Sequence, residues 1–279
     1  MSIERIAVIG AGRVGLSLAR AVVRSGRAVA VLGRHAEALP EPLEPATVVW
    51  DPVIAAADLV LVAVPDDAVA QVSLTLARSG VVGGRHVVLH TSGLYDRSVF
   101  AALESSGAAL GSWHPLQTFS LLAGEPGALA GSPAVIEGDP RALVTGRELA
   151  DLLHLRPVIE IAGDRKASYH AGAVFASNYL VVLADIAARL ARDAGADGAS
   201  AQLFLPLMRR TLANYGTGGV ATLTGPISRG DADTVARHLE ALEGSERALY
   251  IALGREALRL ATASGLDPHA AKTIEQLLY

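Results

Sequence analysis

The sequence contains no cysteine, which excludes thiol nucleophiles, disulfide bonds and cysteine-ligated metals. It also lacks the Gly-x-Ser-x-Gly elbow of hydrolases, the zinc motif His-Glu-x-x-His and the phosphate loop Gly-x-x-x-x-Gly-Lys-Ser/Thr. The eight histidines show no tight metal-ligand spacing, and His86 and His90 fall on a predicted strand, where they would not share a helix face. We therefore expect no metal site.

A strong charge of either sign is absent as well. The net charge of −4 argues against a surface for nucleic acid or for an anionic membrane. Hydrophobic residues make up 51% of the chain and charged residues 19%, the balance of a folded protein with a sizeable core. No uncharged apolar run reaches about 18 residues, so no transmembrane helix is predicted. The first strand begins too close to Met1 for a signal peptide, and we expect a cytoplasmic protein.

The chain is organised around a glycine-rich turn close to its start. The apolar run Ile6–Ile9 leads into Gly-x-Gly-x-x-Gly, and helical spacing follows over 13–25. In a strand–turn–helix unit, the first glycine permits a tight turn, the second admits a pyrophosphate and the third lets the helix pack on the strand. The helix N-terminus then favours the phosphates. The residues predicted to bind a dinucleotide here are Gly10, Ala11, Gly12, Arg13, Val14 and Gly15.

The residue after the second predicted strand, 28–32, indicates which dinucleotide is bound. An NAD site usually places an acidic residue there for the ribose 2′-hydroxyl, whereas an arginine accommodates a 2′-phosphate. This chain has Arg34, with His35 behind it. We therefore predict NADP(H) as the cofactor; the alternative is an ordinary solvated arginine in a loop.

Strands and helices alternate through the first half of the chain. The predicted strands are 3–9, 28–32, 47–50, 58–64, 85–89 and 108–113, and a strand–helix–strand unit over 133–161 closes the sheet. The continuous apolar run at 58–64 is typical of a parallel strand buried on both faces. This order predicts an α/β fold with a doubly wound Rossmann sheet.

Polar residues follow three of these strands in succession. Ligands of such sheets lie beyond the carboxyl ends of the strands, so the three clusters should line one crevice with the glycine turn. Taken singly, each histidine is better interpreted as a structural loop residue, and only the three clusters together predict a lined pocket. The residues predicted to contact the cofactor are Val64, Pro65, Asp66, His90 and Ser92, and His114 is predicted to contact the substrate.

The second half of the chain is predicted to be all-α. We place a boundary between an NADP-binding domain, 1–162, and a helical substrate and dimerisation domain, 163–279. A helix from Arg165 to about Ala194 is apolar almost all round over 171–183, which predicts burial on several sides. A domain dominated by such a helix needs a partner, so a homodimer is expected. Further helices are predicted at 198–214, 231–242, 245–264 and 268–278, with a loop at 216–219.

Two places in this half carry candidate chemistry. Lys166 and His170 share one stripe of the long helix, with Asn178 on its flank. If this stripe faces the strand ends, Lys166 is the proton donor or carbonyl polariser, and His170 and Asn178 orient the substrate. A loop before the helix at 231 suits a small carboxylate through the residues Thr224, Gly225, Pro226 and Arg229. The structural alternative is that Asp231 simply caps that helix.

A set of motifs gives the chain a family resemblance over nearly its full length. The motifs are Gly10–Gly15, Val64–Asp67, His90–Gly93, Ser112–Phe119 and Thr224–Asp231, in this order. Together they resemble a bacterial family with a Rossmann-like N-terminal domain and a helical C-terminal domain of unknown function, DUF2520. More distantly, the layout is similar to the 6-phosphogluconate dehydrogenase C-terminal-like superfamily, which includes ketopantoate reductase and pyrroline-5-carboxylate reductase.

The resemblance implies NADP-dependent reduction or oxidation of a small carboxylate-bearing substrate in a cleft between domains. Ketopantoate reductases have a lysine early in the long helix and an asparagine one turn later. Lys166 matches that lysine, but His170 stands where the asparagine is expected, and the next asparagine is Asn178.

Three hypotheses follow from these observations. The main one is an NADP(H)-dependent oxidoreductase acting on a small keto or hydroxy acid. The second is a non-catalytic NADP-binding sensor or scaffold protein, which the displaced asparagine keeps open. The third is an imine reductase of the pyrroline-5-carboxylate reductase type.

Overall fold

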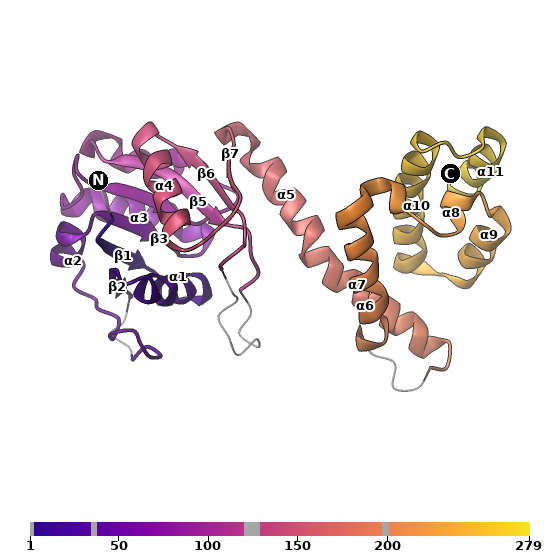
Figure 1. The fold of residues 1–279 in the computed structure, drawn as a ribbon, viewed down its shortest axis with the longest axis horizontal. Coiled ribbons are helices and arrows are strands. Elements are labelled where there is room, and N and C mark those ends of the chain that lie inside the picture. The colour runs from indigo at the N-terminus through magenta and orange to yellow at the C-terminus, as the bar shows by residue number, and fades with distance from the viewer. Residues whose placement is uncertain (1–2, 35–37, 120–128, 197–200) are drawn as a thin grey trace. The chain divides into compact units, whose positions relative to one another are not determined.

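The computed structural model describes residues 3–34, 38–119, 129–196 and 201–279. The chain divides into two compact units, Met1–Asn178 and Tyr179–Tyr279. The first unit is α/β and the second is helical, as the sequence predicts (Figure 1).

The first unit is built on one seven-stranded sheet with the order β2-β1-β3-β4-β5-β6-β7. Neighbouring strands from β2 to β5 pair in parallel, and β6 joins β5 antiparallel, with β7 parallel to β6. The strands are β1 (Arg5–Ile9), β2 (Ala28–Leu32), β3 (Leu59–Val62), β4 (Val87–His90), β5 (Ala109–Pro115), β6 (Ala134–Gly138) and β7 (Val158–Glu160). The chain reverses its direction of travel across the sheet between β2 and β3, which creates a crevice at the carboxyl ends of β1 and β3.

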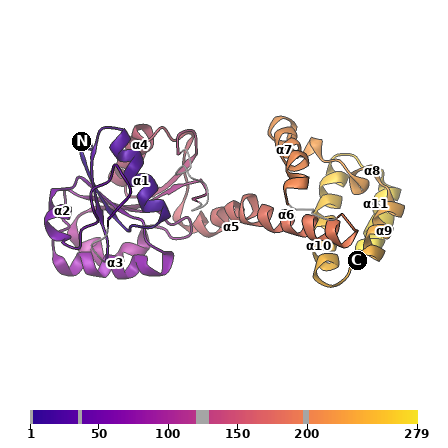
Figure 2. The same cartoon turned by 90° about the horizontal axis from the view of Figure 1, so that it is seen from below.

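Helices cover both faces of the sheet, as Figure 2 shows. One face packs against α1 (Arg13–Arg24) and α4 (Pro140–Leu152), and the other against α2 (Asp51–Ala56), α3 (Asp66–Ser79) and the 3₁₀-helix η1 (Arg97–Ser106). In β3, Leu59 and Leu61 belong to the first apolar cluster, while Val60 and Val62 belong to the second. This division explains the unbroken apolar run of that strand and confirms the doubly wound architecture.

The predicted strand at 47–50 is wrong. Only one bridge, between Leu32 and Thr47, joins this segment to the sheet, and Trp50 already precedes α2. The Pro-rich stretch before Thr47 and the helix after Trp50 leave no length for a ladder. The sixth predicted strand, 108–113, continues to Pro115, because β6 pairs with it as far as the Pro115–Ala134 register.

The long predicted helix is divided in two. The 3₁₀-helix η2 (Gly163–Arg165) leads into α5 (Lys166–Ala176), and α6 (Asn178–Asp193) begins after Ser177, whose φ of −126° and ψ of −71° interrupt the helix. The predicted burial on several sides is also wrong for the single chain, since Val181 is 72% exposed. Within the segment Gly163–Asp193, an 18-residue window has a mean hydropathy of 1.6, so by length and composition alone this helix could cross a membrane, which is weak evidence for a membrane span.

The second unit is a helical bundle. Its elements are α6, α7 (Ala201–Gly218), η3 (Gly219–Thr222), α8 (Pro226–Arg229), α9 (Ala232–Ala241), α10 (Gly244–Ala263) and α11 (Pro268–Leu278). The last four helices enclose a small core around Val235, Leu258 and Ile274. The loop predicted at 216–219 is wrong: α7 continues to Gly218, and the Thr217 hydroxyl donates to the Asn214 carbonyl at 2.9 Å inside it.

Candidate functional site

The glycine turn lies between β1 and α1, and its three glycines meet different surroundings. A Cβ added at Gly10, where φ is +119°, would lie 2.3 Å from the Ala63 oxygen. One added at Gly15 would lie 1.9 Å from the Gly10 oxygen. At Gly12, by contrast, an added Cβ would have no heavy atom within 4 Å among the described residues other than its own chain neighbours. The outer two glycines are required by packing, and the middle one borders open space.

That open space adjoins the first turn of α1. Gly12 is extended, with φ of −81° and ψ of −177°, and no side chain caps the helix. Free N–H groups and the helix dipole at such an end favour an anion. The absent Cβ of Gly12 leaves room for a pyrophosphate, so this turn fits a dinucleotide. Ala11 and Val14 are half-buried beside it, and Arg13 is exposed.

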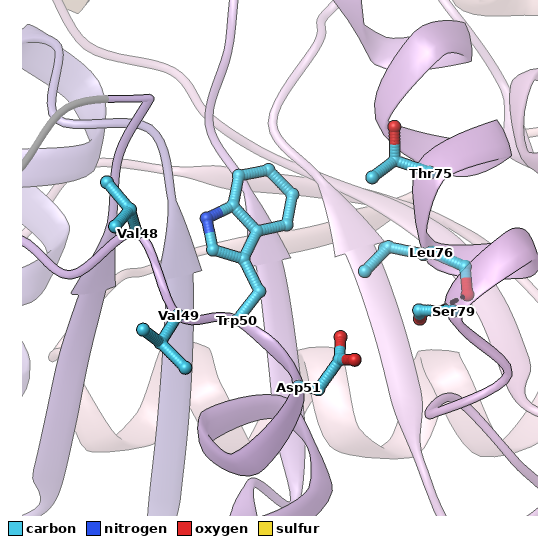
Figure 3. A pocket seen from close by; sticks show the side chains of 7 residues that line it. All are labelled: Val48, Val49, Trp50, Asp51, Thr75, Leu76 and Ser79. Atoms are coloured by element: carbon cyan, nitrogen blue, oxygen red, sulfur yellow. Dashed lines mark hydrogen bonds between the residues drawn. The ribbon is translucent and has the colours of Figure 1, made fainter.

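Arg34 is exposed directly after β2 and Gly33, whereas His35 lies outside the described residues. The Gly33 N–H donates to the Thr47 oxygen at 3.1 Å, and the Trp50 indole N–H donates to the Gly33 oxygen at 3.2 Å. Trp50 also lines a pocket of about 520 Å³ with Val48, Val49 and residues of α3 (Figure 3). The segment predicted as a strand therefore braces the turn that carries Arg34.

His90 and Ser92, both predicted to contact the cofactor, are buried and hydrogen-bonded to other residues of the chain. His90 ends β4 with no exposed surface, its Nε2 lies 3.1 Å from the Asp96 oxygen, and burial lowers its pKa to about 4. The Ser92 hydroxyl accepts N–H bonds from Leu94 and Tyr95 at 3.1 and 3.2 Å. Val64, Pro65 and Asp66 follow β3 at the same edge of the sheet. Their contacts with a cofactor stay a prediction.

Lys166 is the first residue of α5, and its side chain enters the carboxyl edge of the sheet. It is 1% exposed, and its Nζ donates to the Ser92 oxygen at 2.9 Å and to the Ser112 Oγ at 2.8 Å. Burial lowers its pKa to about 8, although the carboxylates of Glu137, Asp96 and Asp66 oppose this effect. The site therefore holds a buried ammonium group whose pKa lies close to neutral pH.

Glu137 is a neighbour of this lysine that the sequence analysis missed. It lies on β6, where it pairs in register with Ser112, and its Oε2 accepts the Arg97 N–H at 2.8 Å. Burial raises the pKa of its carboxyl group. A carboxylate inside the apolar strand 134–138 was the available signal. For Ser112 no pattern marked the hydroxyl as the partner of Lys166.

A cleft of about 850 Å³ lies between the end of β5, the segment 116–119 and α5, all within the first unit. His114, His170 and Asn178 line it, as does Tyr169, which the sequence analysis missed. The His114 Nδ1 lies 2.7 Å from the Tyr169 hydroxyl, and the rings of His114 and His170 are 6.0 Å apart. Tyr169 lies three residues after Lys166, so helical spacing was the signal that could have found it.

The surroundings of His114 and Tyr169 in the cleft keep both side chains neutral near pH 7. Burial, reinforced by the charge of Lys166, lowers the pKa of His114 to about 4. Burial raises the pKa of Tyr169 to about 12. A neutral phenol hydrogen-bonded to a neutral imidazole can donate or accept a proton without carrying a resting charge.

The predicted substrate loop belongs to the second unit. Thr224 and Pro226 line a pocket of about 270 Å³ there, Gly225 has φ of +114°, and Arg229 is exposed on α8. Asp231 caps α9 by accepting the Thr234 N–H at 3.0 Å, which confirms its structural role. The contact of Thr224, Gly225, Pro226 and Arg229 with a substrate stays a prediction.

Comparison with protein families matches both parts of the chain. Residues 2–115 match a Rossmann-like domain, and residues 132–257 match a domain of unknown function, DUF2520. No curated protein matches the chain.

Solved structures match nearly the whole chain. A Bacteroides fragilis protein provisionally named an NADP oxidoreductase is 26% identical over 91% of this chain and 98% of its own, with a TM-score of 0.72. A Myxococcus stipitatus imine reductase in complex with NADP⁺ is 17% identical over 99% of this chain and 100% of its own, with a TM-score of 0.62. An Aspergillus terreus reductive aminase in complex with NADPH is 18% identical over 100% of this chain and 93% of its own, with a TM-score of 0.60.

These similarities extend through both compact units, and they agree with the glycine turn, the sheet order and the helical second half. The chain is therefore a Rossmann-like N-terminal domain followed by a DUF2520 domain.

Proposed function

We propose that the protein is an NADP(H)-dependent oxidoreductase that transfers hydride to or from a small carboxylate-bearing keto or hydroxy acid. The observation that carries the proposal is the buried ammonium of Lys166 at the carboxyl edge of a dinucleotide-binding sheet. A charge held there at a cost to folding is typical of a functional site. The similarity to solved NAD(P)-dependent reductases supports the same reaction class.

In this proposal the cofactor supplies or accepts the hydride, and the chain binds both reactants and manages the proton. The phosphates occupy the space at Gly12 and the N-terminus of α1, and Arg34 pairs with the 2′-phosphate. The positive charge of Lys166 stabilises the negative charge that develops on the substrate oxygen. His170 and Asn178, which line the cleft of the first unit, orient the substrate.

Arg34→Asp tests the choice of cofactor. Loss of a charge-assisted bond to the 2′-phosphate is expected to weaken NADPH binding about 10- to 100-fold, with NADH binding changed less than about twofold. Isothermal titration calorimetry with both nucleotides measures the two affinities. Arg78→Asp, the same charge change on an exposed arginine of α3, serves as the control. Equal effects of Arg34→Asp on both nucleotides contradict the assignment.

The reaction itself is tested by incubating the protein with NADPH and a panel of 2-keto acids and cyclic imines while following absorbance at the nicotinamide band. Turnover of keto acids supports the main proposal. Turnover of imines alone favours the second candidate, an imine reductase of the pyrroline-5-carboxylate reductase type, which the likeness to imine reductases supports. Tight NADPH binding with no turnover of any compound favours a sensor or scaffold protein.

We also propose a homodimer formed through the helical unit. Val181 on α6 and Leu207 on α7 are 72% and 64% exposed, and Leu203 and Leu212 add 56% and 51%. Apolar surface of this extent is rarely left in water, and a second copy of the chain would cover the same faces of both helices. The proposed protomer is cytoplasmic and contacts neither membrane nor nucleic acid.

The double variant Val181→Asp/Leu207→Asp tests this interface. Burying two carboxylates in an apolar contact is unfavourable, so the variant should be monomeric at micromolar concentration, where the native protein has twice the chain mass of 28.8 kDa. Light scattering after size exclusion measures both masses. Val144→Asp, at a 62% exposed valine of α4, should stay dimeric. A native protein that is monomeric, or soluble only in detergent, contradicts the proposal.

A further inference from the structure

We propose that Tyr169, held by His114, is the group that delivers the proton accompanying hydride transfer, and that Lys166 acts through its charge alone. This inference rests on the proposed oxidoreductase function. It assigns the role of proton donor to Tyr169, which lies outside all the sequence motifs described above.

Tyr169 lies where a proton donor to the substrate has to lie. Tyr169 and His114 come from α5 and β5, both are partly exposed, and both line the 850 Å³ cleft. Lys166 does not line that cleft, is 1% exposed, and donates two of its three protons to Ser92 and Ser112. A proton donor must come within hydrogen-bond distance of the reacting atom. The phenol meets this condition, and the ammonium does not.

A hydrogen bond of 2.7 Å joins the Tyr169 hydroxyl to the His114 Nδ1. If Nδ1–H donates to the phenol oxygen, the phenol proton is free to point into the cleft. Among the described residues, the His114 ring is hydrogen-bonded through Nδ1 and lines the cleft, so Nε2 is the nitrogen that can exchange a proton with solvent there. The imidazole can therefore take up a proton on one nitrogen and release one from the other.

His114 and His170 are closely packed against the backbone at Gly93. A Cβ added at Gly93 would lie 2.4 Å from the His170 Nδ1 and 3.1 Å from the His114 Nε2. The backbone at Gly93 therefore lies directly against both imidazoles. His170, whose Nδ1 has no partner among the described residues, forms the wall beside the phenol–imidazole pair.

The one proton that the reduction consumes comes from solvent through the His114–Tyr169 pair. As hydride adds to the carbonyl carbon, the π electrons of the C=O bond move to oxygen, and this oxygen takes the phenol proton of Tyr169. The phenolate then takes the Nδ1 proton of His114 while Nε2 takes a proton from a hydronium ion of the solvent. This leaves a neutral imidazole in its other tautomer, and exchange with solvent restores the starting tautomer. The substrate is reduced and the nicotinamide is oxidised; in the reverse direction each transfer runs backwards.

Tyr169→Phe keeps the ring and removes only the hydroxyl. Turnover on the substrate found in the panel should fall about 100-fold or more, the range for loss of a general acid, while the Kd for NADPH changes less than about twofold. In the nucleotide-free protein, the ¹⁵N resonance of the His114 Nδ1 should shift in the variant, because its hydrogen-bond partner is gone. The native enzyme should also show a solvent deuterium isotope effect on turnover that Tyr169→Phe alters.

Tyr250→Phe is the matched control for structure. The Tyr250 hydroxyl makes the same kind of hydrogen bond to His238, at 2.9 Å, in the second unit. The melting temperature of Tyr250→Phe therefore shows how much stability is lost with one phenol–imidazole hydrogen bond. The His114 resonance should not move in this variant. An active native enzyme with an equally active Tyr169→Phe variant, or an unshifted His114 resonance, overturns the inference alone. A native enzyme that is inert on the whole panel overturns the proposed function and this inference with it.

Discussion

Lys166→Met is expected to lower turnover about 100-fold or more while leaving NADPH binding nearly unchanged. Methionine fills a similar volume but removes a buried positive charge whose field acts on the substrate oxygen through the low-dielectric wall of the cleft, where a charge has a far larger effect than in water. The cofactor phosphates lie at the glycine turn, on a different part of the sheet edge, so binding should be spared. Steady-state kinetics and calorimetry measure the two effects, and an equal loss of both contradicts the assigned role.

The same variant should fold about as stably as the native protein. A pKa lowered from 10.5 to about 8 means that the protonated lysine costs the folded state about 3 kcal/mol at pH 7. Removing it relieves this cost but leaves the Ser92 carbonyl and the Ser112 hydroxyl without their donor, a loss of about 1–3 kcal/mol for a buried polar group. The two effects nearly cancel. Urea denaturation at pH 7 checks the balance and separates lost chemistry from lost structure.

The pH dependence of Lys166 gives a second measure of the same residue. Because the folded pKa is the lower one, the unfolded chain binds more protons between about pH 8 and pH 10.5. The free energy of unfolding of the native protein should therefore rise across this window relative to Lys166→Met. If the ammonium is the active form, kcat/KM should fall above about pH 8 in the native enzyme, and Lys166→Met should lack this limb.

Gly12→Val is expected to weaken NADPH binding at least about 100-fold, because its side chain fills the space through which a pyrophosphate approaches the backbone. The extended conformation at Gly12, with φ of −81°, accommodates valine, and apart from the chain neighbours no heavy atom of the described residues lies within 4 Å of an added Cβ. Valine is a poor N-cap, so the folded state should lose only about 1 kcal/mol. Fluorescence titration with NADPH and thermal unfolding measure these two effects.

Two further glycine variants serve as controls for Gly12→Val, one at a position with open space and one at a closely packed position. Gly83→Val adds the same side chain at another position with open space and should bind NADPH normally. Gly15→Val should instead unfold at a much lower temperature, because its Cβ would lie 1.9 Å from the Gly10 oxygen. If Gly12→Val binds NADPH with native affinity, the dinucleotide is not bound at this turn. If it unfolds like Gly15→Val, the open space at Gly12 has been misassigned.

Local patterns in the sequence were sufficient for the sheet and most helices. The unbroken apolar run of β3 predicted a strand buried on both faces, and Leu59–Val62 is buried throughout. The strand predicted at 47–50 and the loop predicted at 216–219 are both wrong for the same reason. Their residues have ordinary strand or loop preferences, and only the neighbouring elements decide that Trp50 precedes α2 and that α7 runs through Gly218.

The candidate site likewise has features that local sequence predicts and features that depend on tertiary contacts. By itself, the sequence determined the glycine turn, the parallel sheet and the position of Lys166 at the start of a helix, because these depend on residues close together in the chain. Only the tertiary structure decided that Lys166 is buried against Ser92 and Ser112, which lie 74 and 54 residues away, and that Tyr169 meets His114 across 55 residues. Contacts of that separation follow from how strands and helices pack, and no local periodicity encodes them.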